Sequence, residues 1–342
     1  MKRMLAILLA AVLAMAGLSG CGDKKETGTA ETSGGSESGE KKDAADFKVG
    51  LSMNVLVHPS YITMEAEIRK GCEELGYEYV CTDAQESLDK QISDIEDLAA
   101  QGCDVIFVNT YDPDVLTPVI NNVAAQGIRV IAVDNALSDE AQLATTIQAD
   151  NHQNGVLVGN FVADTLKGQD IKIVCISGAK GAEVSRVRRS SFIEGIVEEQ
   201  LRQGSDAKVE IVAQAYTEWF ADATVTAMED IMALNEEFNV VFAEADVMAI
   251  ECYKILQDAG MLDKVMIVAD ADGQKEAFEL IKEGGAYKAT GLNSMTLLGQ
   301  TAVETAQKIQ QGETSFPYRT YTPSACVTID NVDEYYDPDS AF

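Results

Sequence analysis

The sequence predicts an α/β protein built from two doubly wound parallel-sheet domains of the Rossmann type. Short apolar runs alternate with amphipathic segments from residue 47 onward, and the whole pattern restarts after residue 150. The apolar runs are rich in Val and Ile throughout, as buried parallel strands are. A chain of 342 residues is also longer than one hydrophobic core commonly serves, so two domains are expected.

In the first half, strands and helices alternate at the length of a βαβ crossover. The expected strands cover residues 47–53, 77–82, 103–109 and 129–134. The expected helices cover residues 61–76, 87–102 and 114–127. In the second of these helices, Leu88, Ile92, Ile95 and Leu98 fall on one face, which is the pattern of an amphipathic helix packed on a sheet.

The second half begins with a helix over about residues 151–167 and then repeats the alternation. The expected strands cover residues 171–177, 208–214, 239–244 and 264–270, and helices are expected at 246–260 and 273–285. Polar residues stand where strands of both halves end: Asn54, Asn109, Asp134, Glu244, Asp270 and Asp272. Because ligands of such sheets bind beyond the carboxyl ends of the strands, two facing sheets would direct these side chains into one cleft for a polar ligand.

The first residues predict export. Lys2 and Arg3 precede an apolar run that is too short for a membrane span, and residues 1–20 are therefore interpreted as a signal peptide. The ending Leu18-Ser19-Gly20-Cys21 resembles the lipobox of bacterial lipoproteins, so Cys21 is expected to carry the lipid, although an ordinary signal peptide with a chance cysteine is the alternative. Residues 21–45 are nearly free of apolar side chains and are expected to form a flexible acidic tether.

The charge and the cysteines limit the possible partners. A formal charge of −30 excludes nucleic acid and broad contact with anionic lipid, so the membrane is expected to be reached only through the lipid. The six remaining cysteines show no metal-binding spacing, and we expect unpaired thiols, with Cys72 and Cys81 the first candidates if a disulfide exists. No metal and no cofactor are expected.

The motifs of enzymes are missing from this sequence. No strand is followed by Gly-x-Gly-x-x-Gly, and the segment 178–185 lacks the Lys-Ser/Thr ending of a phosphate-binding loop. The segment 270–279 fails the calcium-loop spacing, and two histidines supply little acid–base chemistry. We therefore predict a protein that is not an enzyme.

An unusual arginine cluster remains to be explained. Arg186, Arg188 and Arg189 stand where a helix should begin, at the end whose dipole repels cations. The cluster could hold a phosphate, could be solvated, or could line a polar cleft.

From residue 47 to about 330 the chain resembles the sugar-binding proteins of bacterial ABC transporters, of the type 1 periplasmic-binding class typified by ribose-binding protein. The resemblance rests on segments in the same order as in that family: residues 58–61, 128–136, 147–155, 185–192, 240–249, 268–277 and 289–294. It implies two domains, 46–149 plus 294–322 and 150–293 plus 323–331, joined by a hinge of three segments. Residues 332–342 are expected to form a surface tail.

The resemblance also implies roles for particular carboxylates and amides. Asp134 and Asp272 match carboxylates that accept hydrogen bonds from sugar hydroxyls, with a turn cap as the alternative for Asp134. Asp246 falls at the family's Asn-Asp position, where Ala245 replaces the amide and leaves its direct role open. Asn293 matches an amide that closes the pocket, and Asn54 is a weaker match.

Aromatic and basic positions complete the implied site. Trp219 matches the aromatic that stacks on a sugar face, with a core position as the alternative. Tyr61 and His58 fall where the family often has an aromatic and an amide, although a surface role is equally open for His58. Arg188 aligns with the arginine that points into the cleft.

The resemblance thus answers the question of the arginine cluster. A charge-assisted hydrogen bond from Arg188 is worth about 1.5–3 kcal/mol, more than the roughly 0.3–1 kcal/mol that the helix dipole opposes. Arg186 is expected at the rim and Arg189 in solvent.

The ligand is expected to be a monosaccharide, and an aldohexose rather than a pentose. Ribose-type pockets have an arginine where this chain has Asn135, and an aromatic where it has Ser60. Trp219 and Asn293 resemble the galactose/glucose-binding branch of the family instead. We therefore expect a monomeric, lipid-anchored receptor on the outer face of the cytoplasmic membrane. It would deliver its sugar to a permease driven by a separate ATPase. Autoinducer-2, a polyol or inositol as the ligand, or a signalling partner in place of the permease, are the alternatives.

Overall fold

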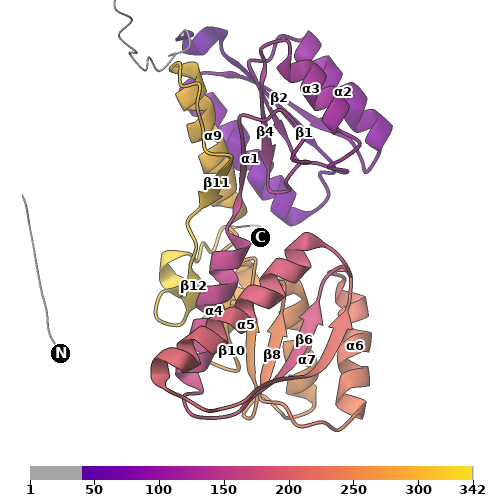
Figure 1. The fold of residues 1–342 in the computed structure, drawn as a ribbon. Helices are drawn as coiled ribbons and strands as arrows, with labels where there is room; N and C mark the ends of the chain where they lie inside the picture. The colour runs from indigo at the N-terminus through magenta and orange to yellow at the C-terminus, as the bar shows by residue number, and fades with distance from the viewer. Residues whose placement is uncertain (1–40, 341) are drawn as a thin grey trace, which may run out of the picture. The chain divides into compact units, whose positions relative to one another are not determined.

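Two six-stranded sheets organise the computed structural model, which describes residues 41–340 and residue 342. The signal peptide, Cys21 and most of the predicted tether lie outside the described residues. The prediction of a two-domain, parallel-sheet α/β fold is confirmed. Figure 1 shows the two sheets with helices on both sides of each.

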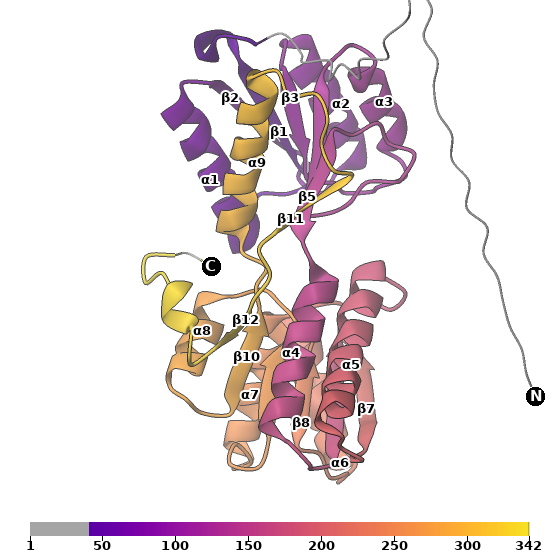
Figure 2. The ribbon, with the colours of Figure 1, turned by 60° about the vertical axis from the view of Figure 1, so that its left-hand side comes forward.

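The first sheet has the strand order β11-β5-β4-β3-β1-β2, and all of its neighbouring strands run parallel. Its strands are β1 (Lys48–Met53), β2 (Glu78–Asp83), β3 (Val105–Val108), β4 (Arg129–Val133), β5 (Thr145–Ala149) and β11 (Arg319–Thr322). Helices α1 (Pro59–Leu75) and α9 (Met295–Gln310) pack on one face, and α2 (Leu88–Ala100) and α3 (Thr117–Ala124) on the other (Figure 2). Buried side chains on both faces explain the unbroken apolar runs in the sequence.

The second sheet has the order β12-β10-β9-β8-β6-β7 and is parallel except for the edge pair β10 and β12. Its strands are β6 (Ile171–Ser177), β7 (Val209–Tyr216), β8 (Val240–Ala243), β9 (Met266–Ala269), β10 (Tyr287–Gly291) and β12 (Cys326–Thr328). One face is covered by α4 (Asn151–Thr165) and α5 (Glu183–Gln203), the other by α6 (Ala221–Ala233), α7 (Asp246–Asp258) and α8 (Lys275–Lys282).

The chain passes between the sheets three times, from β5 to α4, from β10 to α9, and from β11 to β12. Each sheet is therefore completed by a segment distant in sequence. The last residues are more closely packed than the predicted surface tail. Val332 is buried in the core of the second sheet, and Tyr335 and Tyr336 pack against that core.

The tether and the cysteines also differ from the expectation in part. Residues 44–46 form a short 3-10 helix, and Lys42 pairs with Asp104 at 2.8 Å, so the end of the predicted tether is held by the first domain. All six cysteines of the described chain are free thiols, four of them buried. The candidate disulfide between Cys72 and Cys81 is therefore wrong, and burial raises the pKa of both thiols to about 12.

Candidate functional site

Polar side chains gather at the carboxyl ends of β1, β3 and β4 in the first sheet. Asn109 is fully buried after β3, and its amide nitrogen donates to the carbonyl of Val133 at 3.3 Å. Asn54, after β1, donates to the carbonyl of Thr110 at 3.3 Å. The side-chain oxygens of both asparagines are buried without a hydrogen-bond partner. Buried polar atoms are normally paired, so these two acceptors suit a ligand that brings donors.

Asp134 turns the chain at the end of β4. Its φ of 66° lies in the left-handed region, which Asp and Asn tolerate better than most residues, and its backbone N–H donates to Ile147 at 2.8 Å. The half-buried carboxylate is thereby held at the sheet edge. Burial raises the pKa of Asp134 to about 6 and the charge of Asp272 adds to the rise, whereas Arg188 and the Tyr61 hydroxyl lower it. The carboxylate of Asp134, at the end of a strand of the first sheet, is thus within electrostatic reach of Asp272 and Arg188 of the second sheet.

Tyr61 stands in the first turn of α1 and completes the cluster of the first sheet. Its hydroxyl accepts a hydrogen bond from Asn135 at 3.3 Å. Burial raises the pKa of Tyr61 to about 12 and Asp134 adds to the rise, while hydrogen bonding from Asn135, Asn109 and Asn54 opposes it. His58 is the exposed residue before α1 and contacts the ring of Tyr61 edge-on, with 5.8 Å between centroids. The structure therefore brings together Asn54, Tyr61, Asp134 and Asn135, with His58 at their margin.

In the second sheet the site is organised by Arg188, in the second turn of α5. The residue is 7% exposed; its Nε donates to Asn151 Oδ1 at 2.9 Å and its Nη1 to the carbonyl of Glu244 at 2.7 Å. Nε lies 3.5 Å from Asp270, and Nη2 lies 4.0 Å from Asp272. No hydrogen bond of Nη2 is recorded within the described chain, so this nitrogen can still donate to a ligand.

Asp272 and Asn293 lie beside this guanidinium and are joined to each other. The Asn293 amide donates to Asp272 Oδ1 at 3.3 Å, and its backbone N–H donates to the Asp272 carbonyl at 2.9 Å. Asn293 is 5% exposed, and its side-chain oxygen is buried without a partner. Burial raises the pKa of Asp272 and the Asp246 charge adds to the rise, while Arg188 and Asn293 lower it. A carboxylate, an amide and a guanidinium are the groups that recognise hydroxyl-rich ligands.

Asp246 has a different task from the ligand contact that the sequence suggested. It is fully buried, and its Oδ2 accepts from the backbone N–H groups of Asp272, Gly273 and Gln274 at 2.7–3.0 Å. Its Oδ1 accepts from Tyr287 at 2.6 Å and Thr290 at 2.7 Å. With five donors on two oxygens, Asp246 holds the loop that carries Asp272 and has no free acceptor for a ligand.

The expectation that Arg189 is solvated is wrong. Its guanidinium pairs with the fully buried Glu244 at 3.1 Å and donates to Ser177 at 3.2 Å. The other oxygen of Glu244 accepts from the backbone N–H of Gly178 at 2.8 Å. The pair thus ties the ends of β6 and β8 to α5, because a buried carboxylate needs such a partner. Arg186 is exposed, as a rim residue would be.

Trp219 lies beyond the end of β7 and is half-buried. It follows Glu218 in a turn where both residues have positive φ, 51° and 60°. Its indole lies against Gly178 and packs on the core of the second sheet. Sequence reasoning missed Asn151, which accepts from Arg188. It placed Asn109 and Asp270 at the strand ends that face the cleft, but it did not name them as ligand contacts.

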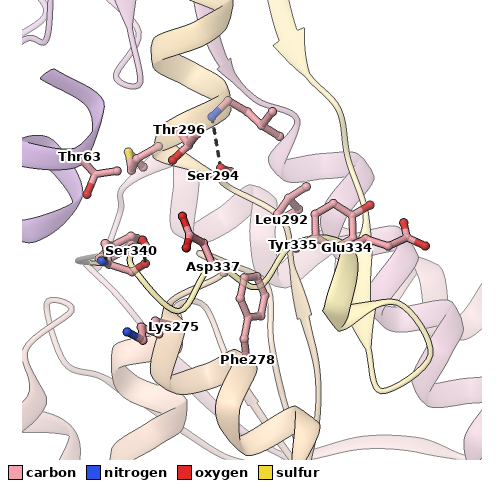
Figure 3. Close-up of a pocket in the computed structure, with 14 residues that line it drawn as sticks. Thr63, Lys275, Phe278, Leu292, Ser294, Thr296, Glu334, Tyr335, Asp337 and Ser340 are labelled. Carbon is pink, nitrogen blue, oxygen red and sulfur yellow. Dashed lines mark hydrogen bonds between the residues drawn. The ribbon is translucent and has the colours of Figure 1, made fainter. Parts of the chain in front are cut away.

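A separate cavity of about 320 Å³ adjoins this site without containing it. It is bordered by the neighbours of the site residues, Gly273 and Ser294, and by the last residues of the chain, including Tyr335 and Asp337 (Figure 3). None of the predicted ligand contacts lines it. The residues described above at the strand ends therefore remain the candidate site.

In the described part of the chain, no group of three or more His, Cys, Asp or Glu side chains is arranged to hold a metal ion. No helix of that part is both long and apolar enough to cross a membrane.

Known proteins resemble this chain in sequence and in fold. The model of the periplasmic binding protein domain matches residues 49–314. The ribose import binding protein of Bacillus subtilis is 29% identical over 278 residues, covering 81% of this chain and 85% of that protein. A solved structure of an ABC transporter solute binding protein from Mycobacterium smegmatis contains bound glycerol. It has a TM-score of 0.72 at 29% identity, and the match covers 86% of this chain and 98% of that protein's chain. A solute binding protein of Actinobacillus succinogenes with bound D-allose has a TM-score of 0.75 at 21% identity, covering 85% of this chain and all of its own, and shows the fold alone.

Proposed function

Because this chain belongs to the family of the periplasmic binding protein domain, whose members bind solutes and are not enzymes, we propose that it captures a monosaccharide for an ABC importer. The sugar lies between the carboxyl edges of the two sheets, where both contribute polar side chains. Binding on both sides favours a closed arrangement of the domains by differential affinity. The closed form then delivers the sugar to the permease.

One observation carries this proposal: Arg188 presents an unused nitrogen beside Asp272, and Asp134 from the other sheet is within their electrostatic reach. Donors and acceptors from both sheets match the alternating hydroxyl groups of a sugar. The similarity to the ribose import binding protein supports a sugar as the ligand class.

Further contacts are part of the proposal. Asn54, Tyr61, Asn135 and Asn293 complete the polar lining, and Trp219 covers the apolar face of the sugar. Asn135 in place of an arginine, together with Trp219, favours an aldohexose over a pentose. His58 contributes at the rim, and Asp246 acts by holding the loop of Asp272 rather than by touching the ligand.

The cellular setting follows from the family and the first residues. The protein is exported, the lipid on Cys21 anchors it to the outer face of the cytoplasmic membrane, and it acts as a monomer. Mass spectrometry of the membrane-extracted protein should find the acylated cysteine, and Cys21→Ala should release the protein into the soluble fraction. A soluble wild-type protein would refute the anchor.

The sugar assignment is tested by titration of the purified protein with pentoses, hexoses, polyols, inositol and autoinducer-2. Tryptophan emission reports binding directly, because the chain has a single Trp. A saturable change with one sugar, accompanied by an increase in Tm and lost in Arg188→Ala, is expected. If no compound of the panel changes emission or Tm, the ligand is not a sugar of these classes.

A further inference from the structure

The candidate site holds more negative than positive charge. The guanidinium of Arg188 lies 3.5 Å from Asp270 and 4.0 Å from Asp272, and its charge lowers the pKa of Asp134. Three carboxylates therefore share one cation. Asp246, directly behind Asp272, adds a fourth carboxylate, whose recorded partners are backbone N–H groups and hydroxyls only.

The neighbouring basic residues do not offset this surplus. Arg189 is paired with Glu244, Arg186 points to solvent, and His58 is exposed on the first sheet's margin. Within residues 41–340 and 342, Arg188 is the one cation recorded within 4.0 Å of Asp134, Asp270 or Asp272. The missing positive charge must therefore come from outside the chain if these carboxylates are all to be ionised.

The unpaired buried atoms of the site are of one kind. Both oxygens of the fully buried Asp270 lack a hydrogen bond, and so does the side-chain oxygen of Asn293, which is 95% buried. In the first sheet the side-chain oxygens of Asn54 and Asn109 are also buried without a hydrogen-bond partner. The asparagine oxygens can only accept hydrogen bonds, and the same holds for both oxygens of Asp270 when it is ionised, so the site suits a ligand with more donors than acceptors.

We propose that the ligand of this cleft carries a positive charge, as an amino sugar or an aminated polyol does. An ammonium group supplies three donors, no acceptor and the charge that the three carboxylates lack. Hydrogen bonds between ionised partners are about twice as strong as neutral ones, so the amine gains over the hydroxyl it replaces. Acidic sugars add a fifth carboxylate and are rejected by repulsion. This inference rests on the sugar-binding function proposed above.

The pKa values of these carboxylates agree with the proposal. Burial raises the pKa of Asp134 to about 6 and that of Asp270 to about 8, in each case with a further rise from neighbouring carboxylates. Asp270 faces Arg188, Glu244 and Asp272; Asp134 faces Asp272, Arg188 and Tyr61. A bound cation would lower these pKa values toward the ordinary range, because it favours the ionised form.

The test compares matched ligands on the intact protein by calorimetry at pH 7 and about 0.15 M salt. Glucose, glucosamine and glucuronate form the first set. Galactose, galactosamine and galacturonate form the second set, and glucitol and 1-amino-1-deoxyglucitol form the third. Each amine should bind at least about tenfold more tightly than its parent, and each uronate at least about tenfold more weakly. Equal or weaker binding of the amine in every set that binds would overturn the inference.

Two variants and a control locate the selectivity. Asp134→Asn and Asp272→Asn should each reduce the ratio of amine to parent affinity, because each removes a carboxylate of the site. Asp230→Asn removes the same charge from an exposed position of α6 and should leave the ratio unchanged. An equal change in all three variants would assign the preference to the overall charge of −30 and refute the proposal.

The two proposals fail differently in this design. Binding of neutral sugars without a gain for their amines overturns the positive charge and leaves the sugar-binding function standing. Binding by no member of the three sets, with no shift in Tm, overturns both.

Discussion

A methyl group added at Gly178 would force the single tryptophan out of its position. In Gly178→Ala, the new Cβ would lie 2.0 Å from Cε2 and 2.2 Å from Nε1 of Trp219, whereas an ordinary contact begins at 3.4 Å. The indole must therefore move by at least about 1.4 Å or the end of β6 must give way. Overpacking of this kind destabilises a protein by about 1–3 kcal/mol.

Two measurements report the displacement of the Trp219 indole. The tryptophan emission maximum should shift, because the indole leaves its half-buried place against the core of the second sheet. Urea denaturation should give a free energy of unfolding that is lower by about 1–3 kcal/mol. Affinity for the sugar found by titration should fall if Trp219 covers its apolar face. Gly285→Ala is the matched control, because its Cβ would have only Tyr253 nearby, at 3.8 Å. An unchanged emission and stability in Gly178→Ala would refute the packing described here.

The other predictions concern the charged groups. Arg188→Lys should weaken ligand binding at least about tenfold in calorimetry, because a lysine cannot reproduce the planar donors that reach Asn151 and Glu244, and wild-type affinity would contradict the role of Arg188. Asp246→Ala removes the acceptor of five hydrogen bonds and should lower the free energy of unfolding by at least about 3 kcal/mol in urea denaturation, and a loss under 1 kcal/mol would count against it. Asp270, with its pKa raised to about 8, binds a proton more readily in the folded than in the unfolded chain, so stability should fall as pH rises from about 5 to 8. Asp270→Asn should flatten that slope in thermal scans at several pH values, and an unchanged slope would exclude Asp270 as its source.

The fold was predictable because the central strands of both sheets are buried on two faces. Runs such as 105–108 and 240–243 are entirely apolar. An unbroken apolar run can be recognised from consecutive residues alone, without knowledge of distant contacts. Helix α1 starts at Pro59, two residues before the predicted start, because proline suits the first helical turn. The edge strands β11 and β12 are short and mixed in composition, and their pairing depends on distant segments.

The candidate site was predictable only to the level of strand ends. Asp134 and Asp272 could be found there, since the ends of parallel strands face the ligand. The resemblance assigned Arg188 to the cleft and Arg189 to solvent. It could not show that Arg189 pairs with Glu244, because this partner is 55 residues away in the sequence. Asp246 was placed in the site by its match to the family's Asn-Asp position. Only the structure shows that backbone N–H groups occupy its Oδ2 and two hydroxyl groups its Oδ1.

The three passages between the sheets have a consequence for how the chain is made. Residues 319–322 pair with residues 146–149 in the first sheet, and residues 326–328 pair with residues 289–291 in the second. Neither sheet can be completed until nearly the whole chain has left the ribosome, and the long loop that β11 must close slows that step. A polypeptide with this topology completes its folding late in synthesis. This delay suits export through a secretory channel, which passes unfolded chains.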